Sequence, residues 1–142
     1  MASAPEVTID VIVHATEDGS KFLDAFEKFF MLPREEFSAE NATGYYDNPI
    51  TVLSARLRKD PARNFLESLL GKMSLSQRNA MVGEITQRVS GSRFHLRLAK
   101  QEFLNGVLSF QEQDAIRLKI YTPVYNKKET VEAFRKIFKL VK

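Results

Sequence analysis

The sequence predicts one α+β domain, in which a two-layer arrangement places helices on one face of a mainly antiparallel sheet. Segments that alternate apolar and polar residues, as half-exposed strands do, are interspersed with segments of helical apolar spacing. The expected order is β-α-β-β-α-α-β-β-α. A chain of 142 residues with 44% hydrophobic side chains can form one such core but is short for two, so residues 1–142 are expected to be a single domain.

The first strand and helix are predicted from the N-terminal quarter of the chain. Residues 7–15 alternate apolar and polar side chains, with Ile12 as the exception, and predict a half-buried strand. Residues 16–18 are a helix-capping segment whose carboxylates favour the positive end of a helix dipole. The helix is expected to run to about residue 32, where Pro33 closes it.

A hairpin and two helices are predicted in the middle of the chain. Strand-like residues 37–46 and 50–59 are separated by the turn-forming sequence Asp47-Asn48-Pro49. Asp60 is expected to cap a helix that has Pro61 at its first position and extends to about residue 72. A further helix is expected over residues 75–89.

The last third of the chain predicts two strands, over residues 93–100 and 115–121, and a helix from about residue 127. The connection between the strands has two interpretations. Asn105-Gly106 is a strong hairpin signal. In the register of that hairpin, however, the apolar Ile116 and Leu118 share a sheet face with the polar His95 and Arg97, which burial disfavours. Either residues 111–114 are the true turn, which we favour, or they contain a bulge that restores the phase.

Composition excludes several classes of protein. The chain has no cysteine, which rules out disulfides, thiolate catalysis and sulfur-ligated metals. It has no apolar run of the roughly 20 residues that cross a bilayer, and its first ten residues do not resemble a secretory leader. We therefore expect a cytoplasmic protein.

Charge is distributed unevenly along the chain. Residues 1–50 carry three Lys or Arg against ten Asp or Glu, whereas residues 51–142 carry eighteen against eight. This asymmetry favours a polyanionic partner for the later part, although acidic and basic segments that complement each other within the fold explain it equally.

Cations from several predicted strands are expected to share the uncovered face of the sheet. On each of these strands the apolar positions point to the helices, so the alternate positions point away from them. Those outward residues are Arg56, Arg58, Arg93, His95, Arg97, Arg117, Lys119 and Tyr121. Arginine suits phosphate contacts, and a flat surface with His and Tyr suits single-stranded or irregular RNA. RNA is therefore the expected partner. A structural or dimerising assembly protein, whose sheet face packs on a protein partner, is the alternative.

No catalytic motif is present. Two histidines are too few and too far apart for a histidine-based metal site, and no phosphate-binding loop or nucleophile elbow occurs. Asp10, Asp47 and Asp114 have the chemistry to gather a magnesium ion, but their spacing carries no signature. We expect a protein that is not an enzyme and needs no cofactor or metal.

Four segments together resemble a known archaeal family. They are HATEDGSKFLDAF (14–26), GYYDNPI (44–50) followed by LSARL, LRLAKQEFLNG (96–106), and DAIRLKI (114–120). They resemble the RNA-binding exosome-subunit-like proteins, whose fold is akin to that of large-subunit ribosomal protein L five. The resemblance implies an archaeal, cytoplasmic and often dimeric RNA-binding protein, with an RNA-processing complex as a further partner.

The resemblance also singles out individual positions. It adds Lys100 to the expected RNA contacts, and its other matching positions are His14, Glu17, Asp18, Gly44, Tyr46, Asn48, Pro49, Gln101 and Gly106. Two departures from the family pattern occur: Tyr45-Tyr46-Asp47 replaces His-Tyr-Gly before Asn-Pro, and Ala99 replaces an Asp before Lys-Gln. If these positions touch RNA or a partner subunit, affinity or assembly differs in this chain.

Overall fold

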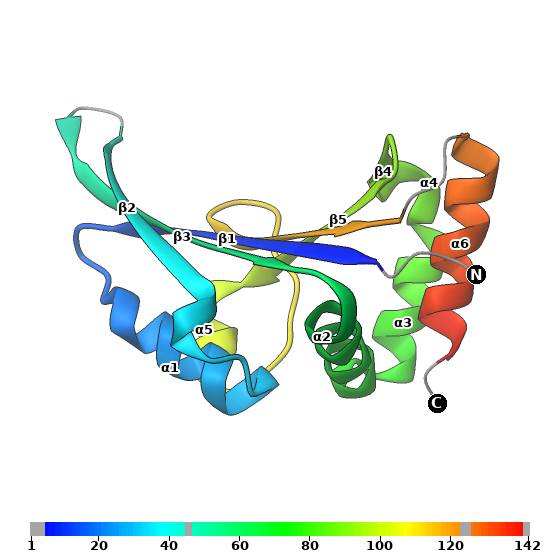
Figure 1. Cartoon of the computed structure of the whole chain (residues 1–142), viewed down its shortest axis with the longest axis horizontal. Coiled ribbons are helices and arrows are strands. Elements are labelled where there is room, and N and C mark those ends of the chain that lie inside the picture. Colours follow the sequence, from blue (N-terminus) through cyan, green and yellow to red (C-terminus); the bar gives the residue numbers. More distant parts are fainter. Residues whose placement is uncertain (1–4, 45–46, 123–125, 141–142) are drawn as a thin grey trace. The chain divides into compact units, whose positions relative to one another are not determined.

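A six-stranded sheet with the strand order β2-β3-β1-β6-β5-β4 organises the chain (Figure 1). The structure is a computed structural model that describes residues 5–44, 47–122 and 126–140. Its elements are β1 Glu6–His14, α1 Gly19–Phe30, the 3-10 turn η1 Arg34–Glu36, β2 Phe37–Thr43, β3 Pro49–Leu57, α2 Lys59–Lys72, α3 Leu75–Gly83, α4 Ile85–Arg88, β4 Val89–Ser90, β5 Arg93–Ala99, α5 Lys100–Leu104, β6 Ala115–Tyr121 and α6 Lys127–Leu140. The predicted α+β class is confirmed, and the order of elements matches broadly.

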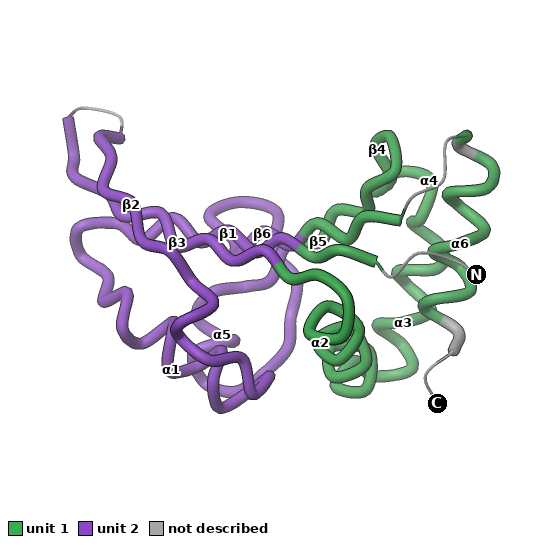
Figure 2. Tube along the Cα trace, in the orientation of Figure 1, with its two compact units in different colours: residues 1–7, 57–96, 119–142 green, residues 8–56, 97–118 purple. Residues whose placement is uncertain are grey.

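The chain divides into two compact units (Figure 2). The first comprises residues 1–7, 57–96 and 119–142, and the second comprises residues 8–56 and 97–118. We call them unit 1 and unit 2. The strands β1, β3, β5 and β6 contribute residues to both units.

The core of unit 2 is a cluster of phenylalanines between α1 and α5. Phe22, Phe26 and Phe30 lie on one face of α1 and are buried. The ring of Phe103, from α5, lies 4.6 Å from that of Phe26 and 5.9 Å from that of Phe30, centroid to centroid. Offset and tilted aromatic pairs at these distances stabilise a core beyond simple burial. Asp18 accepts a hydrogen bond from the Ser20 backbone N–H and so caps α1, as expected.

The core of unit 1 joins β5 to the C-terminal helix. The ring of Phe94 lies 5.3 Å from that of Phe134 and 4.8 Å from that of Phe138, and all three side chains are buried. The helix α6 also packs against α3 and α4. The buried phenylalanines of this helix therefore cover the buried side of β5.

Two helix boundaries differ from the prediction. The helix α2 begins at Lys59 and its N-cap is Arg58, so Asp60 is not the cap and Pro61 is not the first helical residue. Both residues still lie in the first turn of α2. A carboxylate there interacts favourably with the helix dipole. Proline is tolerated there because the backbone N–H groups of the first turn have no partner within the helix. The helix expected over residues 75–89 is interrupted at Glu84, which separates α3 from α4.

The connection between β5 and β6 follows neither predicted route. The chain forms the short helix α5 and then returns along β5, where Phe110 pairs with Leu98. The backbone N–H of Gln111 donates to the carbonyl of Arg97. Successive residues of a strand form backbone hydrogen bonds alternately to its two edges, so Arg97 bonds on the same edge as Arg93, which pairs with β4. Gln111 therefore lies on the β4 edge of β5, whereas β6 lies on the other edge. Residues 111–114 cross β5 to reach β6, and are neither a hairpin turn nor a bulge.

Candidate functional site

The strands of unit 2 have one face that α1 and α5 leave uncovered, since both helices lie on the same side of those strands (Figure 1). We call it the open face. On β3, β5 and β6 of this unit the side chains of Leu53, Ala55, Leu98, Ile116 and Leu118 are buried on the helix side. The alternate residues Arg56, Arg97 and Arg117 are exposed, as the prediction requires.

The strand β1 lies between β3 and β6 and brings an acidic residue, Asp10, to the open face. Asp10 is half-buried there and accepts a hydrogen bond of 2.8 Å from the hydroxyl of Ser54. In unit 1, Glu6 on the same strand lies 3.4 Å from the guanidinium of Arg58. The strand β1 thus separates the cations of β3 from those of β6. Carboxylates of this same chain neutralise part of the positive charge on these strands.

The three arginines of the open face have different surroundings. The Nη1 atom of Arg97 lies 3.3 Å from both a carboxylate oxygen and the backbone oxygen of Glu112. This contact follows from the course of residues 111–114 across β5. Arg117 has no hydrogen-bond or ion-pair partner among the residues that the structure describes. An incoming phosphate therefore displaces no carboxylate of the described residues from Arg117, whereas at Arg97 it has to displace that of Glu112.

In unit 1 the expected site residues lie on β5 and β6 and just after β3. Arg58 and Arg93 are exposed, whereas His95, Lys119 and Tyr121 are half-buried. The guanidinium carbon of Arg93 lies 5.5 Å from the centre of the Tyr121 ring, which is within the range of a cation–π contact. The Tyr121 ring therefore already has a cationic neighbour from the same unit.

Lys100 is the one expected RNA contact that the structure contradicts. Its side chain is 3% exposed and cannot reach a ligand at the surface. The alternation of β5 ends because α5 begins at Lys100, so that Leu98, Ala99 and Lys100 are buried in succession. The Nζ atom donates to the backbone oxygen of Ile12 at 2.6 Å and to the carboxylates of Asp114 at 2.9 Å and Glu17 at 3.1 Å.

Several of the family-motif residues surround this ammonium group. The carboxylate of Glu17 also accepts the backbone N–H of His14, and the imidazole Nε2 of His14 lies 2.9 Å from Asp114. The hydrogen bond from Lys100 lowers the pKa of Asp114, burial of this carboxyl opposes the effect, and His14 adds to it. Within the described residues no group of three or more His, Cys, Asp or Glu is placed to hold a metal ion. The cation between these carboxylates is Lys100.

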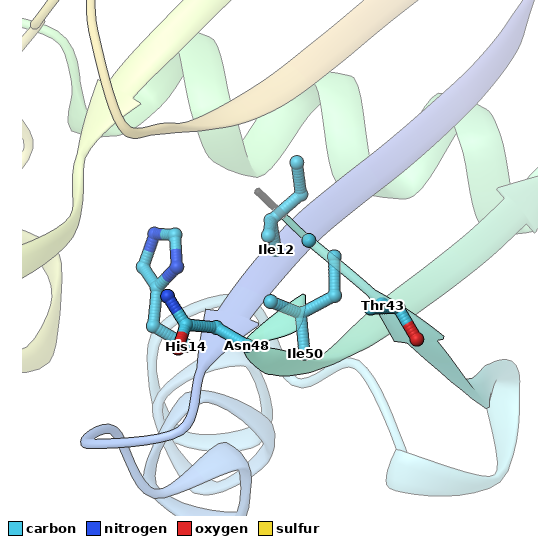
Figure 3. Close-up of a pocket in the computed structure, with 6 residues that line it drawn as sticks. Ile12, His14, Thr43, Asn48 and Ile50 are labelled. Atoms are coloured by element: carbon cyan, nitrogen blue, oxygen red, sulfur yellow. The ribbon is translucent and has the colours of Figure 1, made fainter. Parts of the chain in front are cut away.

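The hairpin between β2 and β3 forms a hollow on the open face. Its described lining consists of Ile12, His14, Thr43, Gly44, Asn48 and Ile50, and its volume is about 630 Å³. Figure 3 shows the side chains of His14, Asn48, Ile12 and Ile50 around it, with the Thr43 hydroxyl pointing away from the isoleucines. The backbone N–H of Gly44 donates to the oxygen of Asn48 at 2.8 Å and closes the hairpin.

Some residues of the hollow were predicted from the sequence, but as family-motif positions and not as parts of a binding site. His14, Gly44 and Asn48 were expected from the resemblance, and the hollow brings them together. Ile50 was not expected at a site, and Asp114 was considered only as a possible magnesium ligand, although Ile12 stood out as an apolar residue at a polar position of its strand. Pro49 begins β3, and Gln101 is exposed on α5. Gly106 has a φ of 78°, and Tyr45 and Tyr46 lie outside the described residues.

Helices that could span a membrane are not found in the described ranges.

Comparisons with known proteins agree on one family. The family model described as RNA binding matches residues 6–122. The RNA-binding protein PAB1135 of Pyrococcus abyssi is 32% identical over 136 residues, which are 90% of this chain and 88% of that protein. The DUF54 protein Mth689 of Methanothermobacter thermautotrophicus is 33% identical, with a TM-score of 0.76 over 96% of this chain and 99% of that one. AF2318 of Archaeoglobus fulgidus is 26% identical, with a TM-score of 0.81 over 94% and 99%.

Proposed function

We propose that this chain binds RNA, because it belongs to the RNA-binding family whose model matches its residues 6–122. The observation that supports this function best is the open face of unit 2. Three strands there present exposed arginines, Arg56, Arg97 and Arg117, on the side away from α1 and α5. Guanidinium groups donate paired hydrogen bonds to phosphate and stack on bases, so this surface fits an RNA backbone better than it fits a neutral ligand.

The kind of RNA follows from the shape of the surface. A pleated strand surface with scattered arginines offers no helix to insert into a major groove. Single strands, loops and bulges present their phosphates and bases without a groove. Unit 1 has cations of its own at Arg58, Arg93 and Lys119, of which Arg58 and Arg93 are exposed. We therefore propose single-stranded or irregular RNA as the ligand.

Salt dependence of binding is the direct test. Fluorescence anisotropy with a labelled single-stranded RNA of mixed sequence gives the affinity at several potassium chloride concentrations. If four to six phosphates are neutralised, the slope of log affinity against log salt should be roughly −3 to −4. Replacing Arg97 and Arg117 together by alanine should weaken binding and make the slope shallower by roughly 1 to 1.5.

A charge-matched control separates the open face from general electrostatics. Lys21 and Lys28 are exposed on α1, which covers the other side of the unit 2 strands, and replacing both by alanine removes the same charge. This control should bind nearly as tightly as the parent chain. No binding at low salt, binding that does not respond to salt, or an equal loss in the control would refute the proposed function.

We propose binding without cleavage, so that labelled RNA incubated with the protein and magnesium stays at full length. We also propose an accessory role in RNA processing or degradation, supported only by the resemblance to exosome-subunit-like proteins. Copurification of exosome subunits that survives ribonuclease treatment tests this role. A structural or dimerising assembly protein is the alternative function. A tight homodimer that does not bind RNA, detected by sedimentation at two salt concentrations, favours this alternative.

A further inference from the structure

We propose that the hollow beside the β2–β3 hairpin holds a single unpaired RNA base, with Arg117 at the phosphate of the same nucleotide. This inference rests on the proposed function and names the part of the RNA that the site receives. Its residues are Ile12, His14, Asn48, Ile50 and Arg117, all within unit 2. The proposed site combines an apolar wall, two polar side chains and one cation.

The apolar wall is formed by two isoleucines at positions where a strand normally exposes polar residues. Ile12 and Ile50 are half-buried on the open face, away from the helix-covered core. Apolar side chains held in this way lose contact with water when a flat ring covers them. The volume of about 630 Å³ is within the range of small-molecule pockets and leaves room for a purine or a pyrimidine.

The polar side chains of the hollow can recognise a base edge. Asp114 lies 2.9 Å from Nε2 of His14, and because the Lys100 hydrogen bond lowers its pKa it remains a carboxylate that can only accept. Nε2 therefore donates to Asp114, which leaves Nδ1 on the other side of the ring for a hydrogen bond with a base. The Asn48 amide supplies both donors and an acceptor. A base carries the same mixture of donors and acceptors on its Watson–Crick edge.

The position of Arg117 follows from the pairing of β1 with β6. These strands are hydrogen-bonded neighbours, and His14 at the end of β1 contacts Asp114, which immediately precedes β6. The two strands therefore run antiparallel, so that moving back along β1 corresponds to moving forward along β6. Two residues back from His14 is Ile12, and the outward residue at the corresponding place on β6 is Arg117. Neighbouring strands lie about 4.8 Å apart, which brings the guanidinium within reach of a phosphate whose base occupies the hollow.

Base removal distinguishes this inference from the proposed function. Two probes are compared by anisotropy: a 12-nucleotide uridine homopolymer and a strand of the same length that keeps the ribose and phosphate but lacks the bases. The proposed function needs only phosphates, so both strands should bind. The hollow adds a base contact, so the intact strand should bind roughly 5- to 10-fold more tightly, as expected when one base ring covers the apolar surface of Ile12 and Ile50. Equal affinity would overturn the inference and leave the proposed function standing, whereas no binding of either strand would refute both.

Variants locate the base contact. Replacing Asn48 by alanine and Ile12 by threonine, which keeps a β-branched side chain in β1, should lower affinity for the uridine strand to that for the base-free strand. Affinity for the base-free strand should not change. Gln101→Ala, at an exposed position of α5 on the other side of the unit 2 strands, is the control and should leave both affinities unchanged. Arg117→Ala should weaken both strands. A double variant that retains the full preference for bases would overturn the inference.

A measurement on the unaltered chain removes the dependence on variant folding. Titration with uridine 5′-monophosphate and adenosine 5′-monophosphate, followed by amide NMR shifts, should move the backbone signals of Gly44, Asn48 and Ile50 with saturation. Inorganic phosphate at the same concentrations should move the signal of Arg117 and leave those of the hairpin in place. Shifts confined to other surfaces would place the base elsewhere and overturn the inference.

Discussion

Replacing Lys100 by methionine tests whether the ammonium between His14, Glu17 and Asp114 stabilises unit 2. Methionine keeps the length and apolar stem of the side chain and removes only its charge and donors. The change leaves the Ile12 carbonyl without its 2.6 Å donor, which costs about 1–3 kcal/mol for a buried group. It also removes the counter-charge from two carboxylates, and breaking a buried pair costs about 3–5 kcal/mol.

Solvent decides how much of this cost remains. Glu17 is 18% exposed and keeps the His14 N–H as a donor, and Asp114 is 55% exposed, so water replaces much of what Lys100 supplied. We therefore expect a loss of about 3 kcal/mol rather than the sum of the separate costs. For a chain of this size that loss lowers the melting temperature by roughly 6–12 °C.

Urea unfolding at pH 7 measures the loss directly. Lys21→Met, on the exposed side of α1, is the matched control and should change the free energy of unfolding by about 0.5 kcal/mol or less. Where Lys100→Met remains folded, its RNA affinity should show the same salt slope as the parent chain, because a buried ammonium neutralises no phosphate. Equal stability of the two variants, or a stable Lys100→Met chain with a shallower salt slope, would refute the structural role given to Lys100.

Three other outcomes follow from the same contacts. Asp114→Asn should destabilise the fold at pH 7, and its difference from the parent should shrink below about pH 4 in acid unfolding curves, because a carboxyl with a pKa lowered from 3.8 contributes stability only while it is ionised. Phe103→Ala should cost about 3–5 kcal/mol in urea unfolding, more than Phe29→Ala, since Phe103 is buried and Phe29 only half-buried. Glu112→Gln should tighten RNA binding severalfold in anisotropy at low salt, because it frees Arg97 from its carboxylate partner.

The fold class and most strands could be predicted because alternation and helical spacing directly report which side of an element is buried. Where the prediction failed, a short or tertiary feature decided the structure. The helix α5 spans five residues and has no side-chain cap, so it lacks the repeated spacing on which helix prediction depends. The bridge of Phe110 to Leu98 is a single long-range pair, and its position on the outer edge of β5 leaves no trace in local sequence.

The candidate site could be predicted in part for the same reason. Strand alternation correctly exposed Arg56, Arg97 and Arg117, since facing is a local property of a strand. The order of strands is not local, so the prediction missed that β1 separates β3 from β6 and brings Asp10 to the same face. Lys100 was misplaced because the step from strand to helix ends the alternation at that residue. The hollow forms where residues of β1 meet the β2–β3 hairpin, a contact between segments distant in sequence. The only local indication of it is Ile12, an apolar residue at an outward position of its strand.

The acidic and basic parts of the sequence interact within the fold, and this interaction determines what an RNA can gain. Glu112 already contacts Arg97, and in unit 1 Glu6 contacts Arg58, so a phosphate arriving at either guanidinium exchanges one anion for another. Such an exchange contributes little net free energy but restricts binding to ligands with enough charge to displace both carboxylates. Arg117 has no such partner among the described residues, and the proposed base site places it at the phosphate of the bound nucleotide. The free energy of RNA binding should therefore be concentrated at Arg117 and the hairpin hollow, with the paired arginines selecting for polyanions.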